Sequence, residues 1–462
     1  MRHLKGKKLL SRLVKFAPII LIVLFALALR FYNLDKRTIF DADQEEIAGR
    51  AKELLAGHPV LLGPKTSLGG FSIGPGFSYL WGLSDIFTKG DPIAGAYSSI
   101  FLGAGFIFLI YFFTRKFYSE KTALILSLIS AVSITLIIWD QIPWAPSLFY
   151  LAELLVIFGV YISGKKPIGI FISFLGLVIG FQAHFAVFLL PPAVLIYWLM
   201  FKPKFNRKWI LCSLLITIVG ILPCIIFDMT HHLVNFERLL SIFKLAVAGT
   251  APPVSKIIMT LISNSVSFYY SSFPESLRII IFSVTILVCV IGIVKETKYK
   301  QVLILSLLFL FVPFVFFLFY RSNFSEYYLM SVLPPFIILS GYIFEKINKY
   351  FVVTLVISIF LIFINIKSWE TYVRPMNLWA KEQVVQTIIE MGGKSGYGVS
   401  LSVQPGYGFG YPYLFGYYGA SPDIPPLKNQ KKIFTIVAPP GYRGIEAIKG
   451  FDGIGLRWEG IK

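Results

Sequence analysis

Cysteine is scarce in this chain, and its three copies have no spacing that suggests a shared role. Cys212, Cys224 and Cys289 lie within or at the ends of apolar runs, and none belongs to a C-x-x-C pair. A disulfide framework or a cysteine-based metal site would need regular pairing of cysteines. We therefore expect the three thiols to be small buried residues without a redox function.

Charged residues are also few, at 15% of 462 positions, whereas 56% of the residues are hydrophobic. A water-soluble domain usually has about 25% charged residues. Apolar runs long enough for a helix to cross roughly 30 Å of hydrocarbon recur along the chain. This composition predicts an all-α polytopic membrane protein.

Acidic residues are the scarcer charge, with 24 Asp and Glu against 43 Lys and Arg. We expect no nucleic-acid partner despite this excess, because the basic residues fall in short connections between apolar runs. The chain has no P-loop, no Rossmann fingerprint and no His, Cys or Asp spacing typical of a metal site. We therefore expect neither a cofactor nor an obligatory metal.

Eleven membrane spans are expected. The basic start is followed by the apolar run "FAPIILIVLFALALRFY", which we interpret as an uncleaved first span because no A-x-A cleavage site follows it. The other spans are expected near residues 92–113, 122–139, 147–163, 167–182, 185–201, 209–227, 279–294, 301–319, 328–344 and 351–366.

Residues 167–201 are the one ambiguous stretch, since a single helix of this length would be roughly 52 Å long. Basic residues flank it on both sides, in "GKK" and "KPKFNRK". Because basic connections belong on the cytoplasmic side, the chain must cross an even number of times between them. We expect two short spans that turn at "FQAHF".

Charge then predicts the orientation in a cell (plasma or inner) membrane, with a cytoplasmic amino end and an extracytoplasmic carboxyl end. Three larger regions are expected outside, at residues 34–90, 228–278 and from Lys367 onward. Helix-like and strand-like stretches in the last region predict a small α/β domain at 367–462, which follows a membrane domain at 1–366.

The densest acidic cluster lies in the first outer region, in "TIFDADQEEIAGRAKELL". Its apolar residues are spaced for one helix face, which predicts an interfacial helix: Ile47, Ala48, Ala51, Leu54 and Leu55. Asp43 begins this helix and is a candidate catalytic carboxylate. The alternative is structural, because Asp43 and Glu46 have the spacing of a capping box.

A glycine-rich stretch follows, "HPVLLGPKTSLGGFSIGPGFSYLWGL". It offers backbone N–H groups and Lys65, which together suit a phosphate group. The alternative is an ordinary flexible loop.

The order of these features resembles the GT-C superfamily, integral-membrane glycosyltransferases that use polyprenyl-phosphate sugars. The acidic pair is followed by the helix pattern D-x-x-x-x-A-x-x-A-x-x-L, then by "WDQIPWAPS", "FQAHFAVFLLPP" and "RSNFSEYYLMSVLPPFIIL". The chain is most similar to the protein-mannosyltransferase-like bacterial branch, which includes lipid A aminoarabinose transferases. The resemblance covers roughly residues 16–345.

The resemblance implies that Asp43 is the catalytic aspartate, with Asp41 able to exchange roles with it. One departure concerns the phosphate site. Many relatives have Lys or His before the proline of the next motif, where this chain has Ile73 and Gly74 in "IGPGFSYL". Either Lys65 supplies the missing charge or the phosphate is held elsewhere.

Other candidates lie at the outer ends of later spans. His184 is expected to bind the donor, although a lone histidine often has only a structural hydrogen bond. Arg321 suits a phosphate clamp, and snorkelling to the interface is its alternative. The remaining candidates are Tyr327 and Tyr328 for the donor, and Trp139, Asp140 and Trp144 for the sugar or acceptor, with an interfacial aromatic belt as the alternative.

The resemblance thus implies transfer of a sugar from a polyprenyl-phosphate donor to an acceptor hydroxyl at the outer face, with an aspartate as general base. The acceptor is a lipid, glycan or protein that the sequence does not specify. The alternative is a transporter or flippase of lipid-linked saccharides. That function would need several ionisable residues inside the spans, where Glu153 is the main example.

Overall fold

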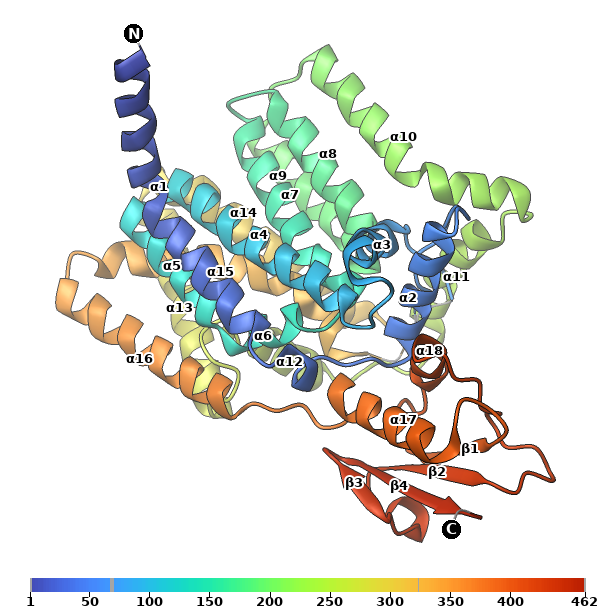
Figure 1. Cartoon of the computed structure of the whole chain (residues 1–462). Coiled ribbons are helices and arrows are strands. Elements are labelled where there is room, and N and C mark those ends of the chain that lie inside the picture. Colours follow the sequence, from blue (N-terminus) through green and yellow to red (C-terminus); the bar gives the residue numbers. More distant parts are fainter. Residues whose placement is uncertain (1, 67–69, 323, 461–462) are drawn as a thin grey trace.

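A bundle of helices with a small sheet at one end makes up the computed structural model, which describes residues 2–66, 70–322 and 324–460 (Figure 1). The helices of the bundle and its loops are α1 (Arg2–Phe31), α2 (Ala42–Leu55), α3 (Gly76–Thr88), α4 (Ala94–Phe117), α5 (Glu120–Val132), α6 (Ile134–Asp140), α7 (Phe149–Ser163), α8 (Ile168–Phe181), α9 (Leu190–Phe201), α10 (Arg207–Thr230), α11 (Val234–Ala248), α12 (Val254–Val266), α13 (Glu275–Lys295), α14 (Thr297–Phe319), α15 (Leu333–Ile347) and α16 (Phe351–Thr371). Short 3₁₀ helices include η2 (Ala145–Leu148), η3 (Phe185–Leu189) and η4 (Glu326–Val332).

An apolar helix stands at the place of each predicted span. Within the described residues, 7 helices are long and apolar enough to cross a membrane, and α5 with α6 makes an eighth if their 60° bend is counted within one span. Shorter apolar helices occupy Phe16–Phe31, Ile168–Phe181 and Phe185–Phe201. A further one, α12, lies in a region that we expected to be an outer loop; its 13 residues would reach only about 20 Å.

The turn predicted within residues 167–201 is present. The helix α8 ends at Phe181, and η3 begins at Phe185 after a break. The return of the chain is clear because the Lys204 N–H donates to the Ser163 carbonyl at 2.8 Å. The two basic connections that flank this stretch therefore lie at the same end of the bundle, as the charge pattern requires.

Three more basic connections meet at one end of the bundle. The Glu345 carboxylate accepts hydrogen bonds from Thr122 at 2.6 Å and from Ser119 at 2.7 Å, which joins the α4–α5 connection to α15. Lys346 pairs with Glu296 of the α13–α14 connection. The basic connections of the sequence thus gather in space, while the cellular side that they face stays a prediction.

Reporter fusions can test the predicted orientation. We expect fusions after Gly49 and Gly406 to report outside, and fusions after Lys204 and Lys298 to report inside, because the basic connections are retained in the cytoplasm. Reporter activity in whole cells measures each position. An inside signal at Gly49 would reverse the orientation, and an outside signal at Lys204 would contradict the shared basic end.

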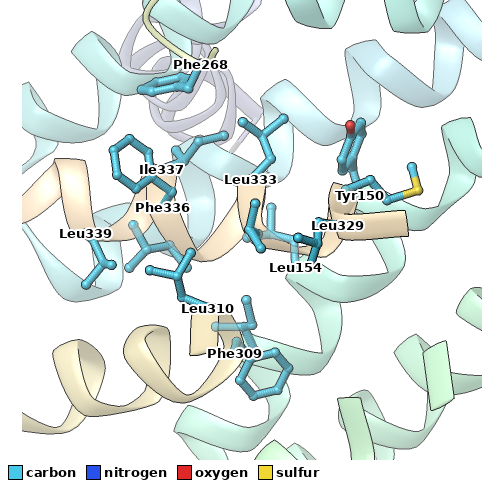
Figure 2. Close-up of a cluster of buried hydrophobic side chains, with 14 of the residues drawn as sticks. Tyr150, Leu154, Phe268, Phe309, Leu310, Leu329, Leu333, Phe336, Ile337 and Leu339 are labelled. Carbon is cyan, nitrogen blue, oxygen red and sulfur yellow. The ribbon is translucent and has the colours of Figure 1, made fainter. Parts of the chain in front are cut away.

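The buried core of the bundle lies where α7, α14 and α15 pack together (Figure 2). Leu333, Phe336 and Ile337 of α15 are at most 2% exposed and meet Leu310 of α14 and Leu154 of α7. Apolar burial gives little driving force between helices in lipid, so close packing of such side chains holds a membrane bundle together. This core supports η4, which runs directly into α15.

The carboxyl-terminal region forms a small α/β unit at the end of the molecule opposite the start of α1 (Figure 1). Its elements are α17 (Leu378–Gly392), β1 (Gly398–Val403), α18 (Tyr411–Tyr417), β2 (Ile433–Ala438), β3 (Lys449–Phe451) and β4 (Ile454–Glu459). The sheet order is β1-β2-β4-β3, and β1 pairs with β2 in parallel while the other pairs are antiparallel.

This unit shares one buried core with the first outer region. Phe40, Ile47 and Trp81 belong to the same cluster of buried side chains as Leu378 and Leu414. Protein therefore covers Ile47, Ala48 and Ala51 of the apolar face of α2, whereas Leu55 at the end of the helix is 48% exposed. The first outer region and the carboxyl-terminal unit consequently fold against each other and support one another.

Candidate functional site

The amino end of α2 is capped by Asp41, so the capping alternative for Asp43 is wrong. Asp41 and Gln44 form the capping box, in which the Gln44 side chain accepts from the Asp41 N–H at 3.0 Å. Glu46 pairs with Arg50 at 2.6 Å and takes no part in the cap. Asp43 lies in the first turn of α2 and takes no part in this cap.

The carboxyl-terminal unit holds this end of α2 in place. Buried Lys381 donates to the carboxylate of Asp41 at 2.5 Å and to the carbonyls of Phe40 at 2.8 Å and Phe409 at 2.9 Å. Glu45 accepts from the N–H groups of Gly410 and Tyr413, at 2.9 and 3.0 Å. Residues on both sides of Asp43 are thus bonded to the carboxyl-terminal unit.

Replacing Lys381 by Met should lower the turnover number more than donor affinity. The change leaves two buried carbonyls and Asp41 without their donor, which lets α2 shift, and a shift of about 1 Å can cost about a hundredfold in rate. Kinetics with varied donor concentration would measure both effects. Lys394→Met, at an exposed position of the same unit, is the matched control. Unchanged turnover in Lys381→Met would show that α2 holds its place without this contact.

Several candidates that are distant in the sequence meet at one cavity of about 80 Å³. Asp43 from α2, Lys65 from the glycine-rich loop, Trp144 before η2, His184 before η3 and Tyr327 from η4 all line it. A carboxylate, an ammonium group, an imidazole and aromatic rings therefore face one space. This combination suits proton removal beside an anionic group and a sugar ring.

Burial changes the pKa values of two groups that line this cavity, Asp43 and His184. Burial first, and then the carboxylates of Glu46 and Asp41, raise the pKa of Asp43 above its ordinary value. Burial lowers the pKa of His184 to about 3, so its ring is neutral near pH 7. The Nδ1 atom of His184 accepts from the Ala186 N–H at 3.2 Å, which places the ring proton on Nε2. His184 is thus both a structural cap and a neutral N–H donor.

The glycine-rich loop packs closely against Gln182. A Cβ atom at Gly74 would lie 2.1 Å from the Gln182 side chain, so any residue larger than glycine there would require Gln182 to move. The same side chain accepts from the Gly76 N–H at 3.0 Å and donates to the Gly220 carbonyl at 2.8 Å. Lys65, earlier in the same loop, is the basic residue that lines the cavity.

A second, wider cavity of about 500 Å³ adjoins the first and shares Asp43 and Trp144 with it. Asp41, Trp139 and Arg374 also line it. The rings of Trp139 and Trp144 stack with centroids 4.9 Å apart. Asp43 therefore borders both cavities, and the stacked rings of Trp139 and Trp144 lie beside it.

Three candidates line neither of these two cavities. Asp140 lies in the interior, where its carboxylate pairs with fully buried Arg30 at 2.7 Å, and its contact with the sugar stays a prediction. Tyr328 is buried behind His184 and packs on Phe185. Arg321 is exposed at the end of α14 and lies outside the residues that line either cavity.

Arg374 and Lys381 are site-supporting residues that the sequence analysis missed. Both belong to the chain after the last span, where no local motif marks them. Among the described residues, no group of three or more His, Cys, Asp or Glu is placed to hold a metal ion. The metal-free mechanism stays a prediction.

An apolar groove of about 370 Å³ runs between α8, η3, α10 and α11. Phe71 of the glycine-rich loop and Phe181 and Val187 of the α8–η3 turn line it. The same loop and the same turn supply Lys65 and His184 to the first cavity. The groove and the cavity therefore adjoin along shared elements.

Two solved structures illustrate the likeness of this architecture to known proteins. ArnT from Cupriavidus metallidurans, bound to undecaprenyl phosphate, superposes with a TM-score of 0.61 at 11% identity, over 96% of this chain and 98% of that one. The chain has the GT-C fold. A second GT-C structure, AglB from Archaeoglobus fulgidus with an inhibitory peptide and a dolichol-phosphate, gives a TM-score of 0.51 at 12% identity, over 92% of this chain and 69% of AglB. The sequence itself matches no protein-family model and no curated protein.

The GT-C likeness extends beyond the span of the sequence resemblance. The match with ArnT covers nearly the whole chain, whereas the sequence motifs end near residue 345. The carboxyl-terminal unit therefore lies within the superposed length. At this level of identity the likeness shows the fold, and the roles of single residues rest on the geometry of the site.

Proposed function

We propose that this protein transfers a sugar from a polyprenyl-phosphate donor to an acceptor hydroxyl at the outer face of the membrane, with Asp43 as the general base. The observation that carries the proposal is the meeting of Asp43, Lys65 and His184 in one cavity beside an apolar groove. A carboxylate with a raised pKa, a cation and a neutral N–H donor are the groups that such a transfer needs.

The donor lipid would occupy the apolar groove, and its phosphate would lie at Lys65 and His184. A polyprenyl chain is apolar and gains free energy from leaving water in proportion to the area that it buries. Lys65 supplies a positive charge, and His184 supplies the Nε2–H. Two solved structures of the same fold contain such carriers, ArnT with undecaprenyl phosphate and AglB with a dolichol-phosphate.

The reaction forms one bond and breaks another at the anomeric carbon. The acceptor oxygen attacks that carbon, and the bond from the carbon to the phosphate oxygen breaks, with its electron pair staying on the leaving polyprenyl phosphate. Asp43 takes the acceptor proton as the new bond forms. Lys65 and His184 stabilise the charge that grows on the leaving phosphate.

The outer location follows from the arrangement of charge. The basic connections gather at one end of the bundle, and α2, η3 and the carboxyl-terminal unit lie away from them. If the basic end is cytoplasmic, the cavity faces outward. A lipid-linked sugar suits the outer face of the membrane, because its transfer requires no nucleotide sugar.

One observation favours the transporter alternative. Glu153 of α7 is fully buried, and neither of its carboxylate oxygens has a hydrogen-bond partner in the described part of the chain. An ionisable residue inside a membrane bundle often marks a transport path. Glu153 lines none of the cavities described above, so the transferase proposal explains more of the structure.

Reconstitution separates the two functions. The purified protein in proteoliposomes would receive a panel of polyprenyl-phosphate sugars and a cell-envelope extract as the acceptor source. We expect mass spectrometry to detect free polyprenyl phosphate together with a glycosylated acceptor. Movement of the lipid-linked sugar between leaflets without a covalent product would support the flippase instead.

Donor affinity should depend on Lys65 more than on Arg321. Lys65→Ala removes the cation that lines the cavity, and a lost charge-assisted hydrogen bond typically costs about tenfold or more in affinity. Arg321→Ala is the matched control, since its exposed side chain lies outside the cavity. Binding of polyprenyl phosphate by microscale thermophoresis measures both. The reverse order would make Arg321 the phosphate clamp that the sequence suggested.

A further inference from the structure

A hydroxyl-rich stretch lies in the otherwise apolar second half of the membrane domain. Residues 263–272 read "SNSVSFYYSS" at the end of α12 and just beyond it. Ser263, Asn264, Ser267 and Ser271 of this stretch line a cavity of about 220 Å³ between α6, α13 and η4. This volume exceeds the roughly 10–15 Å³ that one water molecule needs, so the cavity can hold an organic ring.

Arg278 in the first turn of α13 supplies the charged donor of this cavity. Its Nη1 atom donates to the Ser263 hydroxyl at 2.9 Å, which holds the guanidinium in place. Arg278 itself lines the cavity, and a guanidinium carries five N–H groups in all. A guanidinium held in this way can donate its remaining N–H groups to a ligand oxygen.

The neighbouring groups add acceptors and further donors. Glu326 of η4 lines the cavity, and its carbonyl accepts from the Asn264 amide at 2.9 Å. The Thr135 hydroxyl donates to the Ser267 carbonyl at 2.9 Å, which fastens α6 to the hydroxyl-rich stretch. The presence of Glu326 beside Arg278 disfavours a highly charged anion and suits a ligand with many hydroxyl groups.

Two aromatic residues connect this cavity to the candidate site. Trp139 lines both this cavity and the wide cavity at Asp43, and Tyr327 lines both this cavity and the small one. An aromatic ring presents an apolar face that the C–H face of a sugar ring can cover, while its edge stays open to polar groups. This cavity therefore lies next to the two cavities at Asp43, and Trp139 and Tyr327 stand between them.

We propose that the cavity lined by Ser271 and Arg278 is a second saccharide subsite, which holds a sugar ring next to the site of transfer. The proposal rests on the proposed function and deepens it, because it makes one of the two substrates a saccharide of more than one unit. Either a donor oligosaccharide or a glycan acceptor supplies this ring; both present the same hydroxyl-rich chemistry.

Binding of free sugars tests the subsite without any transfer. The full-length protein in nanodiscs would be probed by saturation-transfer NMR with a panel of neutral hexose and N-acetylhexosamine mono-, di- and trisaccharides. We expect at least one member to bind to the wild type. Ser271→Trp should fill the cavity and weaken that binding by about tenfold or more. Ser272→Trp is the matched control, since it is equally exposed, adjacent and outside the cavity lining.

A second variant tests the donor group without filling space. Arg278→Lys keeps the charge and loses the planar fork, so affinity for the bound sugar should fall by about tenfold. Equal binding by wild type, Ser271→Trp and Arg278→Lys would overturn the subsite, and so would a panel without any binder.

Competition in the transfer assay identifies the source of the ring. A free saccharide that raises the KM for the acceptor assigns the subsite to the acceptor, and one that raises the KM for the donor assigns it to the donor. Failure of the proposed function gives a different pattern: sugar binding would persist and respond to Ser271→Trp, while polyprenyl-phosphate binding and transfer would be absent. Transfer without sugar binding at this cavity would refute the subsite alone.

Discussion

Asp43→Asn should reduce sugar transfer by about a hundredfold to ten-thousandfold, the usual cost of removing a general base. Expression, thermal stability and donor binding should stay close to wild type. The reason is structural: the carboxylate faces the cavity and is not part of the cap of α2. Single-turnover transfer, thermal unfolding in detergent and polyprenyl-phosphate binding would be measured on the same preparation.

Asp41→Asn is the matched control for this result. It should keep more of the chemistry, because asparagine caps a helix about as well as aspartate. It should lose some stability, because it removes the negative charge that pairs with buried Lys381. If Asp41→Asn loses transfer while Asp43→Asn retains it, the base lies two residues upstream.

The pH dependence of the transfer rate should reflect the raised pKa of Asp43. A general base acts only when it is deprotonated, and the pKa of Asp43 is raised above its ordinary value, chiefly by burial. The rate should therefore fall as the pH drops through a pKa higher than that of an ordinary aspartate. His184 stays neutral in this range because its pKa is lowered to about 3. A profile that falls only at the ordinary pKa of a solvated aspartate would argue against Asp43.

Asp140→Ala should lower the free energy of unfolding by about 3–5 kcal/mol, since it leaves the buried guanidinium of Arg30 without its partner. Thermal unfolding in detergent would show the loss as a lower Tm. The double variant Arg30→Met with Asp140→Leu should recover most of the stability, because apolar replacement of a whole buried pair is often tolerated. Normal stability with lost transfer in Asp140→Ala would return Asp140 to the sugar site.

The sequence was most informative where the signal is local or physically obligatory. A run of apolar residues must form a helix in lipid because its backbone groups have no other partners, so each predicted span has a helix at its place. The turn before His184 was found because the basic connections on both sides force an even number of crossings. The cavity could be anticipated in part because its residues lie at the outer ends of such spans.

The contacts that complete the site have no local signal. Asp41 and Lys381 are separated by 340 positions, and nothing near either residue indicates the other. The partner of Asp140 has no local signal either: a charge at the end of a span suits a cavity or a buried partner equally, and Arg30 lies 110 positions earlier. The sequence resemblance suggested the aspartate, whereas only the packing shows what holds it.

The shared core of the first outer region and the carboxyl-terminal unit has a consequence for biogenesis. Synthesis proceeds from the amino end at about 5–20 residues per second, so α2 leaves the ribosome long before Leu378 and Leu414 exist. Until then Phe40 and Ile47 lack the side chains that cover them. The candidate site of the nascent protein therefore stays incomplete through most of membrane insertion, and a chain that stops before Leu378 cannot assemble it. Completion of translation acts as the final step of maturation.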